Sequence, residues 1–580
     1  MAKKTMLYRK TLSIITMIIF ITGNIITPVN AASQTAQNTL AAPGLTDPFG
    51  PLDPGGWGRM NPGPGNGISN SANQPAPKKI SVNAKALNKL YNMPDYVSAT
   101  TGAANPKTTD LSLNAQHMPL TIQRTYNGNP DRQGPLGYGW TFNYDQYLQM
   151  HQEFKIAEYR GDASIGIYNY TKNNPGQLAD SCDEDPLIYY NLDDGYYTPD
   201  SQADKSTLTR HSGDSYTVKT KEGTTYHYAG YKAPWRSQRG EAGKLTAVED
   251  RNGNKITLTY DSSGNLTQAE DSYGRKLTFG YHNNLLTTAT DPVGRTVNYT
   301  YDRNNNLIQV NGLDGAVEYH SYDSSHRLTG YTDALGQTIT YTYDGEGKVT
   351  QTVRTGGDDQ RTYTYHPDQN KTTVSDINGD TTTYTYDQNK NITSIEDPLH
   401  NITGYTWDSA GNLTGITEPD GSKTEHQYDT SNNLTKITAN GLTASYEYQP
   451  EYNQLTRITD PNGKETVYRY DSKGNLTSET NGIGQTTGFA YDSLGKLTEI
   501  SDPAGHKTSL EYDQNGNLKQ ITNALGQKTT CSIDQAGRIL SLTQPGNRTT
   551  TLTYQDSHQP VSVTDPTGKT TQYQYNKKTP

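Results

Sequence analysis

The stretch Tyr470-Asp471-Ser472-Lys473-Gly474-Asn475-Leu476-Thr477 decides the fold, because its pattern returns at a fixed distance along the chain. The Tyr-Asp pair, or whatever residue stands in its phase, occurs sixteen times in register. Every interval is 20, 21 or 22 residues, and the mean is 21. The anchors are Tyr260, Tyr281, Tyr301, Tyr322, Tyr343, Tyr365, Tyr386, Trp407, Tyr428, Tyr448, Tyr470, Tyr491, Tyr512, Ile533, Tyr554 and Tyr575. Such regularity indicates a repeat array.

One repeat is read as a β-hairpin. Gly411-Asn412 forms a turn, residues 413–417 a short strand, residues 419–421 a second turn, and residues 422–428 a second strand. Leu413 and Ile416 stand three apart, which breaks the alternation of a flat strand and predicts a bulge or strong twist. Seven repeats end in Tyr-x-Tyr, and the period of two places both rings on the same face.

A single hairpin of this kind is marginal in water, so each must pair with its neighbours. The result is a continuous antiparallel sheet, and a long sheet with open edges must curl to avoid aggregation. We therefore expect an all-β protein whose tandem hairpins wind into a curved shell.

The composition agrees with a thin, polar sheet. Of 580 residues only 31% are hydrophobic, and 44 Tyr stand against 6 Phe and 4 Trp. Tyr buries its ring while keeping a polar tip, so it can supply most of the core. This composition disfavours a helical bundle and a multi-span membrane protein. The net charge of -10, without basic clusters, disfavours nucleic-acid binding.

The N-terminus carries the pattern of a secretory signal. Basic residues within the first ten positions precede an apolar stretch, residues 12–26, and a cleavage-type site ends at Ala31. The alternative is a single N-terminal membrane anchor, but the stretch is short for a span. We expect cleavage, no span afterwards, and a secreted or cell-wall-associated protein.

Five segments follow from the pattern. Residues 1–31 are the signal peptide, 32–94 a Pro/Gly-rich linker, 95–243 an N-terminal β-rich segment, 244–576 the repeats, and 577–580 a tail. A helix over residues 85–90 is a minor expectation within the linker. Strands are expected at residues 120–126 and 216–220 of the N-terminal segment.

No residue pattern predicts a catalytic or metal-binding site. The twelve His are scattered without metal-ligand spacing, and neither Cys182 nor Cys531 lies in a nucleophile or zinc motif. Asp and Asn at the turns are better explained by turn capping than by calcium. We expect no catalytic residue, no metal site and no cofactor. The Tyr rows could stack on sugars if they are exposed, although packing of a Phe-poor core explains them more simply.

The repeat resembles the YD repeat of the RHS family. The resemblance covers about residues 95–576 and includes an upstream segment, Arg124 to Asn127 followed by Gly134 to Trp140. It is carried by Tyr-Asp-x-x-Gly-Asn-Leu-Thr at 260–267 and 470–477, and by Asp-Pro-x-Gly at 291–294, 460–463, 502–505 and 565–568. The family's complete form ends with a self-cleaving core segment and a variable toxin, and neither follows these repeats before Pro580.

The resemblance implies a hollow β-shell that carries an enclosed toxin in bacterial competition. We expect an exported shell protein, a structural carrier in a polymorphic toxin system that is not itself an enzyme, from a Gram-positive bacterium. Its expected partner is an enclosed effector. The alternative is a cell-surface repeat protein that binds wall glycans.

Overall fold

The computed structural model describes most of the chain from Tyr96 onward. The described residues are 40–41, 80–81, 92–93, 96–113, 118–128, 132–152, 155–171, 196–202, 204–211, 215–230, 243–357, 359–555 and 559–575. The signal peptide, the expected helix at residues 85–90 and Cys182 lie outside these ranges. No helix of the described residues is long and apolar enough to cross a membrane.

Small sheets precede one very long sheet. The strands of the small sheets are β1 (Leu40–Ala41), β2 (Ile80–Ser81), β3 (Asn92–Met93), β4 (Val97–Ser98), β5 (Lys107–Leu113), β6 (Leu120–Tyr126), β7 (Gln133–Gly134), β8 (Gly137–Tyr138) and β9 (Trp140–Phe142). β5, β6 and β9 form a three-stranded antiparallel sheet. The strand expected at residues 120–126 is confirmed as β6.

The long sheet has 39 strands, β10 to β48, and each strand pairs with the next in the chain. Its first part is β10 (Tyr147–Gln152), β11 (Lys155–Tyr159), β12 (Ile165–Thr171), β13 (Tyr196–Pro199), β14 (Thr207–Arg210), β15 (Tyr216–Lys219), β16 (Thr225–Tyr228) and β17 (Gly243–Glu249). β15 confirms the strand expected at residues 216–220 to within one residue.

The repeats supply the rest of the sheet. Their strands are β18 (Lys255–Tyr260), β19 (Leu266–Glu270), β20 (Lys276–His282), β21 (Leu285–Thr290), β22 (Thr296–Tyr301), β23 (Leu307–Asn311), β24 (Val317–Tyr322), β25 (Leu328–Thr332), β26 (Thr338–Tyr343), β27 (Val349–Arg354), β28 (Gln360–His366), β29 (Lys371–Asp376), β30 (Thr381–Tyr386), β31 (Ile392–Glu396), β32 (Ile402–Trp407), β33 (Leu413–Thr417), β34 (Lys423–Tyr428), β35 (Leu434–Ala439), β36 (Leu442–Tyr448), β37 (Leu455–Thr459), β38 (Glu465–Tyr470), β39 (Leu476–Thr480), β40 (Thr486–Tyr491), β41 (Leu497–Ser501), β42 (Lys507–Tyr512), β43 (Leu518–Thr522), β44 (Lys528–Ile533), β45 (Ile539–Gln544), β46 (Arg548–Thr553), β47 (Ser562–Thr564) and β48 (Thr570–Gln572). Two short 3-10 helices, η3 (Leu313–Gly315) and η4 (Pro367–Gln369), interrupt the turns.

The hairpin reading is confirmed, and so is the bulge. Trp407 pairs with Leu413 while Thr406 pairs with Gly415, which leaves Thr414 as an extra residue on its strand. The same shift recurs where a repeat's first strand meets the strand before it, for example at Tyr470 and Leu476. A bulge increases the local twist, so its repetition bends the sheet steadily in one direction.

The first eight strands of the long sheet form a closed barrel. β10 pairs with β11 along its length and also with the start of β17, so the ring β10–β17 is complete. The end of β17 pairs instead with β18. β17 therefore belongs to the barrel and also begins the curved sheet of repeats.

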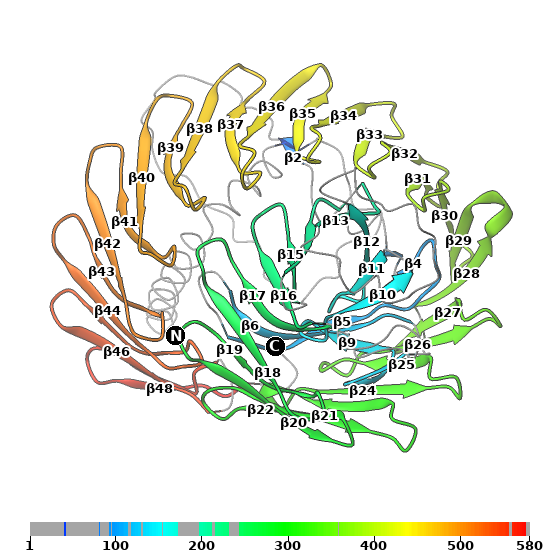
Figure 1. Cartoon of the computed structure of the whole chain (residues 1–580), viewed down its shortest axis with the longest axis horizontal. Helices are drawn as coiled ribbons and strands as arrows, with labels where there is room; N and C mark the ends of the chain where they lie inside the picture. Colours follow the sequence, from blue (N-terminus) through cyan, green and yellow to red (C-terminus); the bar gives the residue numbers. More distant parts are fainter. Residues whose placement is uncertain are drawn as a thin grey trace, which may run out of the picture.

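The repeats curve around the barrel and the three-stranded sheet. Figure 1 shows β24 to β48 following one another along an arc that surrounds β5, β6, β9 and β10–β17. Turns of the barrel end meet turns of much later repeats: Lys221 Nζ donates to Ser431 O at 3.1 Å, and Asn475 Nδ2 donates to Asn252 Oδ1 at 3.0 Å. The largest core cluster joins the N-terminal strands to the inner face of the repeats as far as Ile392, and it also includes Ala536. The N-terminal segment thus lies inside the shell, which its position in the sequence did not indicate.

Candidate functional site

The inner face of the repeats is held by the anchor tyrosines. Each bonded anchor hydroxyl donates to the main-chain carbonyl 15 or 16 residues earlier, which lies at or near the start of the first strand of the same hairpin. Tyr470, for example, donates to Leu455 O at 2.6 Å. The same bond is made by Tyr260, Tyr301, Tyr322, Tyr343, Tyr365, Tyr428, Tyr512, Tyr554 and Tyr575.

Two anchors depart from Tyr. Trp407 keeps the bond, because its indole Nε1 donates to Ile392 O at 2.7 Å. Ile533 has no donor to offer. The anchor rings are therefore part of the packing and hydrogen bonding of the shell. This favours the structural explanation of the Tyr rows, which the sequence already favoured, over the alternative that they stack on sugars.

The Asp of each YD pair caps the turn that follows it. Asp471 Oδ1 accepts from the main-chain N of Lys473 and Asn475, and Oδ2 accepts from Asn475 Nδ2 at 2.9 Å. Gly474 between them has φ +79°, which favours glycine. Among the residues that the structure describes, no three His, Cys, Asp or Glu are grouped to hold a metal ion.

The enclosed three-stranded sheet is bound to the inner face through a buried charge cluster. Arg124 of β6 is fully buried and bonds Asp110 through Nε at 2.6 Å and Glu318 through Nη2 at 2.7 Å. Tyr299 donates to Asp110 at 2.8 Å. Burial alone would lower the pKa of the Arg124 guanidinium, but the two carboxylates raise it well above its ordinary value.

Neutral contacts complete this attachment. The main-chain N of Leu328 donates to the Tyr126 hydroxyl at 2.9 Å, and Trp140 Nε1 donates to the Tyr322 hydroxyl at 2.8 Å. Thr372 donates to Ala99 O at 2.8 Å. The inner face therefore already binds a polypeptide, through its tyrosines, its main chain and one carboxylate.

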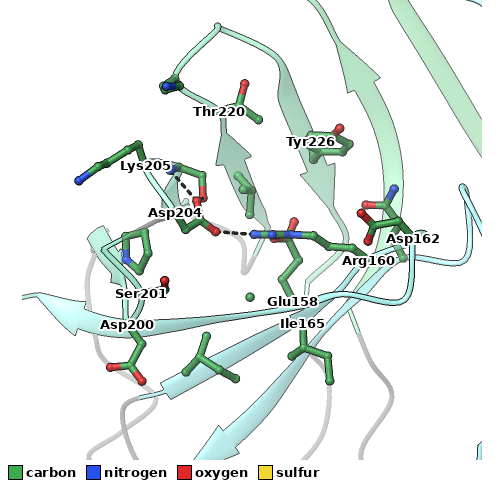
Figure 2. Close-up of a pocket in the computed structure, with 18 of the residues that line it drawn as sticks. Glu158, Arg160, Asp162, Ile165, Asp200, Ser201, Asp204, Lys205, Thr220 and Tyr226 are labelled. Carbon is green, nitrogen blue, oxygen red and sulfur yellow. Dashed lines mark hydrogen bonds and ion pairs between the residues drawn. The ribbon is translucent and has the colours of Figure 1, made fainter. Parts of the chain in front are cut away.

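A polar cavity of about 880 Å³ opens at one end of the barrel. Its floor holds Glu158, whose side chain is only 2% exposed. Glu158 accepts from Tyr228 at 2.6 Å, from Tyr168 at 2.9 Å and from Arg160 Nε at 2.7 Å. Figure 2 shows Arg160 reaching across the cavity to Asp204. Arg160 Nη2 donates to Asp204 Oδ2 at 2.6 Å.

The cavity offers binding groups but no catalytic arrangement among its described residues. Burial, followed by the charge of Glu158, raises the pKa of Tyr228 well above its ordinary value, so this phenol stays protonated. The buried carboxylate of Glu158 is engaged by the hydroxyls of Tyr228 and Tyr168 and by Arg160. Around the opening, the side chains of Lys205 and Tyr226 make no hydrogen bond to another described residue. Residues of β11, β12, β15 and β16 and of the loops beside them line this cavity, and no local sequence motif indicates it.

Two further titratable side chains lie in the sheet, Cys531 and His320. Cys531 carries a half-buried free thiol, and burial raises its pKa to about 11. His320 is buried on the inner face with Nδ1 3.0 Å from Leu307 O, and burial lowers its pKa to about 3. Both side chains serve as packing groups in the sheet.

Comparisons with known families identify three parts of the chain. A family model described as Teneurin YD-shell matches residues 451–579, and one described as RHS Repeat matches residues 241–276, 281–317, 322–359, 386–423 and 428–463. A domain of unknown function, DUF6531, matches residues 94–166. A search of curated proteins found no match.

Several solved structures are similar at low identity. The TcdB2-TccC3 structure is 12% identical, with 83% of this chain and 34% of that chain covered and a TM-score of 0.37. The Tc holotoxin pore from Photorhabdus luminescens is 12% identical, with coverages of 83% and 31% and a TM-score of 0.33. The N-terminal domain of the effector SpvB from Salmonella typhimurium is 11% identical, with coverages of 59% and 100% and a TM-score of 0.18. The chain spans about a third of the length of the two Tc structures.

Proposed function

This chain belongs to the RHS/YD-repeat family, and on that premise we propose that it is an exported shell that encloses a polypeptide. In this proposal the enclosed partner is an effector of a bacterial toxin system, and the shell has no catalytic activity of its own. Export is supported by the signal-like pattern of residues 1–31. The family match and the curvature of the 39-stranded sheet support the enclosure.

The observation that carries the proposal is the attachment of β5, β6 and β9 to the inner face. Arg124, Tyr126 and Trp140 are buried against repeats more than 180 residues away in the sequence. The same inner face continues through β33–β48 with Tyr, Thr and aliphatic side chains and few charges. A lining of this kind can hold a polypeptide by apolar contact without demanding one sequence.

Protease protection tests the enclosure. A flexible segment with a single protease site is appended after Pro580 of the full chain, and its cleavage is compared with that of the same segment on an unrelated folded carrier. Enclosure predicts cleavage at least ten-fold slower on the shell. Equal cleavage rates on both carriers would refute it.

A second candidate function, binding of wall glycans, has one supporting observation. The barrel cavity presents both donors and acceptors, as polyhydroxylated ligands require, and barrel mouths are common ligand sites. Purified full chain would be retained on peptidoglycan in this case, and Tyr226→Phe with Lys205→Ala would weaken the retention. Absence of retention would remove the candidate.

A further inference from the structure

One recurrent position of the inner face is uncharged in every repeat but one. The residue two places before each anchor points into the shell. Directly opposite it lies one residue of the next hairpin's first strand. This pairing occurs fifteen times, from Leu258–Ala269 to Leu552–Val563. The first-strand residue is Ala, Val, Ile, Leu, Tyr or Thr in every repeat except one. In β39 it is Glu479, although the repeats on either side carry Ile458 and Ile500.

Glu479 points into the shell. It lies opposite Tyr468, which is 5% exposed, and on its other side it pairs with Thr487. Directly opposed residues of an antiparallel pair share one face of the sheet, so the carboxylate shares the face of the inward tyrosines. Burial raises its pKa. The carboxylate of Glu479 makes no ion pair or hydrogen bond with another described residue.

The same inner face holds one other carboxylate of this kind, and that one is occupied. Apart from the acidic residues that begin turns, Glu318 and Glu479 are the inward carboxylates of the described strands β18–β48. Glu318 pairs with Val310, whose other partner is the inward Tyr299. Its carboxylate receives Arg124 of the enclosed strand β6 at 2.7 Å and Thr108 at 3.2 Å.

We infer that Glu479 is a second binding point of the inner face, which receives a lysine or arginine side chain of the enclosed polypeptide. The inference rests on the proposed enclosure. It adds that the enclosed segment carries a cationic side chain among apolar side chains that pack against the inner-face tyrosines. A half-buried carboxylate without a partner weakens a fold, whereas isoleucine at this position would pack as it does one repeat away. Residues that break a local rule without internal compensation are expected at functional positions. Charge complementarity and the Glu318–Arg124 pair specify the partner as a cation on a polypeptide.

Carboxyl footprinting of the full chain tests this inference. The chain is extended after Pro580 by a Gly/Ser linker of roughly 30 residues, which spans about 30 Å on average, and then by the sequence of β6, Leu-Thr-Ile-Gln-Arg-Thr-Tyr. A matched extension has glutamine in place of its arginine. Both proteins and the unextended chain are treated with carbodiimide and glycine ethyl ester, and labelling of each carboxylate is measured by mass spectrometry.

We expect Glu479 to label in the unextended chain and with the neutral extension, and to label at least five-fold less with the arginine extension. Glu499, on the outer face beside Lys507 at 2.9 Å, is the control and stays constant. The variant Glu479→Gln should make protease protection of the two extensions equal. Glu499→Gln should leave their difference intact.

The experiment distinguishes failure of the Glu479 inference from failure of the proposed enclosure. If both extensions are protected from protease but Glu479 labels equally with each, the inference about Glu479 is overturned while the enclosure stands. If neither extension is protected and Glu479 labelling never changes, the enclosure is refuted and the inference with it.

Discussion

The guanidinium of Arg124 donates from Nη2 to Glu318 Oε2 at 2.7 Å, although 194 residues separate them in the sequence. This pair, with Asp110, attaches the enclosed sheet to the repeats. Removing one partner leaves carboxylates buried without a counter-charge, so Arg124→Met should lower the free energy of unfolding of this region by about 3–5 kcal/mol. Hydrogen exchange of β5, β6 and β24 would measure it.

Arg457→Met is the matched control, because Arg457 pairs with Glu465 at 2.6 Å on the exposed outer face. It should cost far less than Arg124→Met, because an ion pair on the solvent-exposed face contributes little to stability. Equal losses for the two variants would show that the buried cluster contributes no more than a surface pair.

The anchor hydroxyl is tested by Tyr470→Phe. This change keeps the ring and removes the bond to Leu455 O. The expected loss is about 1 kcal/mol, seen as faster hydrogen exchange in β37 and β38. Tyr319→Phe is the control, since Tyr319 is 51% exposed and makes no such bond. Unchanged exchange in Tyr470→Phe would contradict a stabilising role for the hydroxyl.

The missing bond at Ile533 can be restored. Ile533→Tyr places a hydroxyl in the phase where most of the bonded anchors reach the carbonyl 15 residues earlier, here that of Leu518. We expect β43 and β44 to be stabilised by about 1 kcal/mol. A variant Ile533→Phe, which adds a ring without a donor, separates the bond from ring packing. A gain equal in both would assign the effect to the ring.

Two turn glycines form a matched pair. Gly463 has φ +77° and open space around its missing Cβ, whereas at Gly474 a Cβ would lie 2.7 Å from Gln454 Oε1 and 2.9 Å from the Tyr452 ring. Gly463→Ala should cost about 1–2 kcal/mol from backbone strain alone. Gly474→Ala should cost more, because the turn also meets Tyr452. Local hydrogen exchange measures both losses of stability. Equal losses would show that the Tyr452 side chain moves away from the added Cβ at little cost.

Glu479 should make stability depend on pH. Its pKa in the folded chain is raised above the value of about 4.3 in an unfolded chain, so the unfolded state ionises first as pH rises. The stability of β38–β40 therefore falls as pH rises through that unfolded value. The facing hydroxyls of Tyr468 and Tyr470 remain protonated throughout this range.

Glu479→Gln should accordingly match the wild type below about pH 4 and exceed it at pH 7. Urea unfolding of both proteins at the two pH values measures the difference. A wild type that is the more stable of the two at pH 7 would show that the ionised carboxylate has a favourable partner in the empty shell.

Sequence reasoning recovers what is local and repeated. The spacing of Tyr470 from Tyr491 predicts hairpins, and the spacing of Leu413 from Ile416 predicts the bulge, because both depend on neighbours within one or two strands. The closure of β10 onto β17 and the pairing of Arg124 with Glu318 depend on how the whole sheet curves. Glu479 could have been noticed from the 21-residue spacing, which places it where Ile458 and Ile500 stand, but its orientation required the register.

Because β17 pairs with both β10 and β18, the two ends of the long sheet differ. One end of the long sheet is sealed inside a closed ring, so strands can be added beyond the described sheet only next to β48. An unpaired strand edge is the usual template for association between chains. In the described part of the long sheet this edge lies at β48, so that sheet can pair with a further strand there and not at its barrel end.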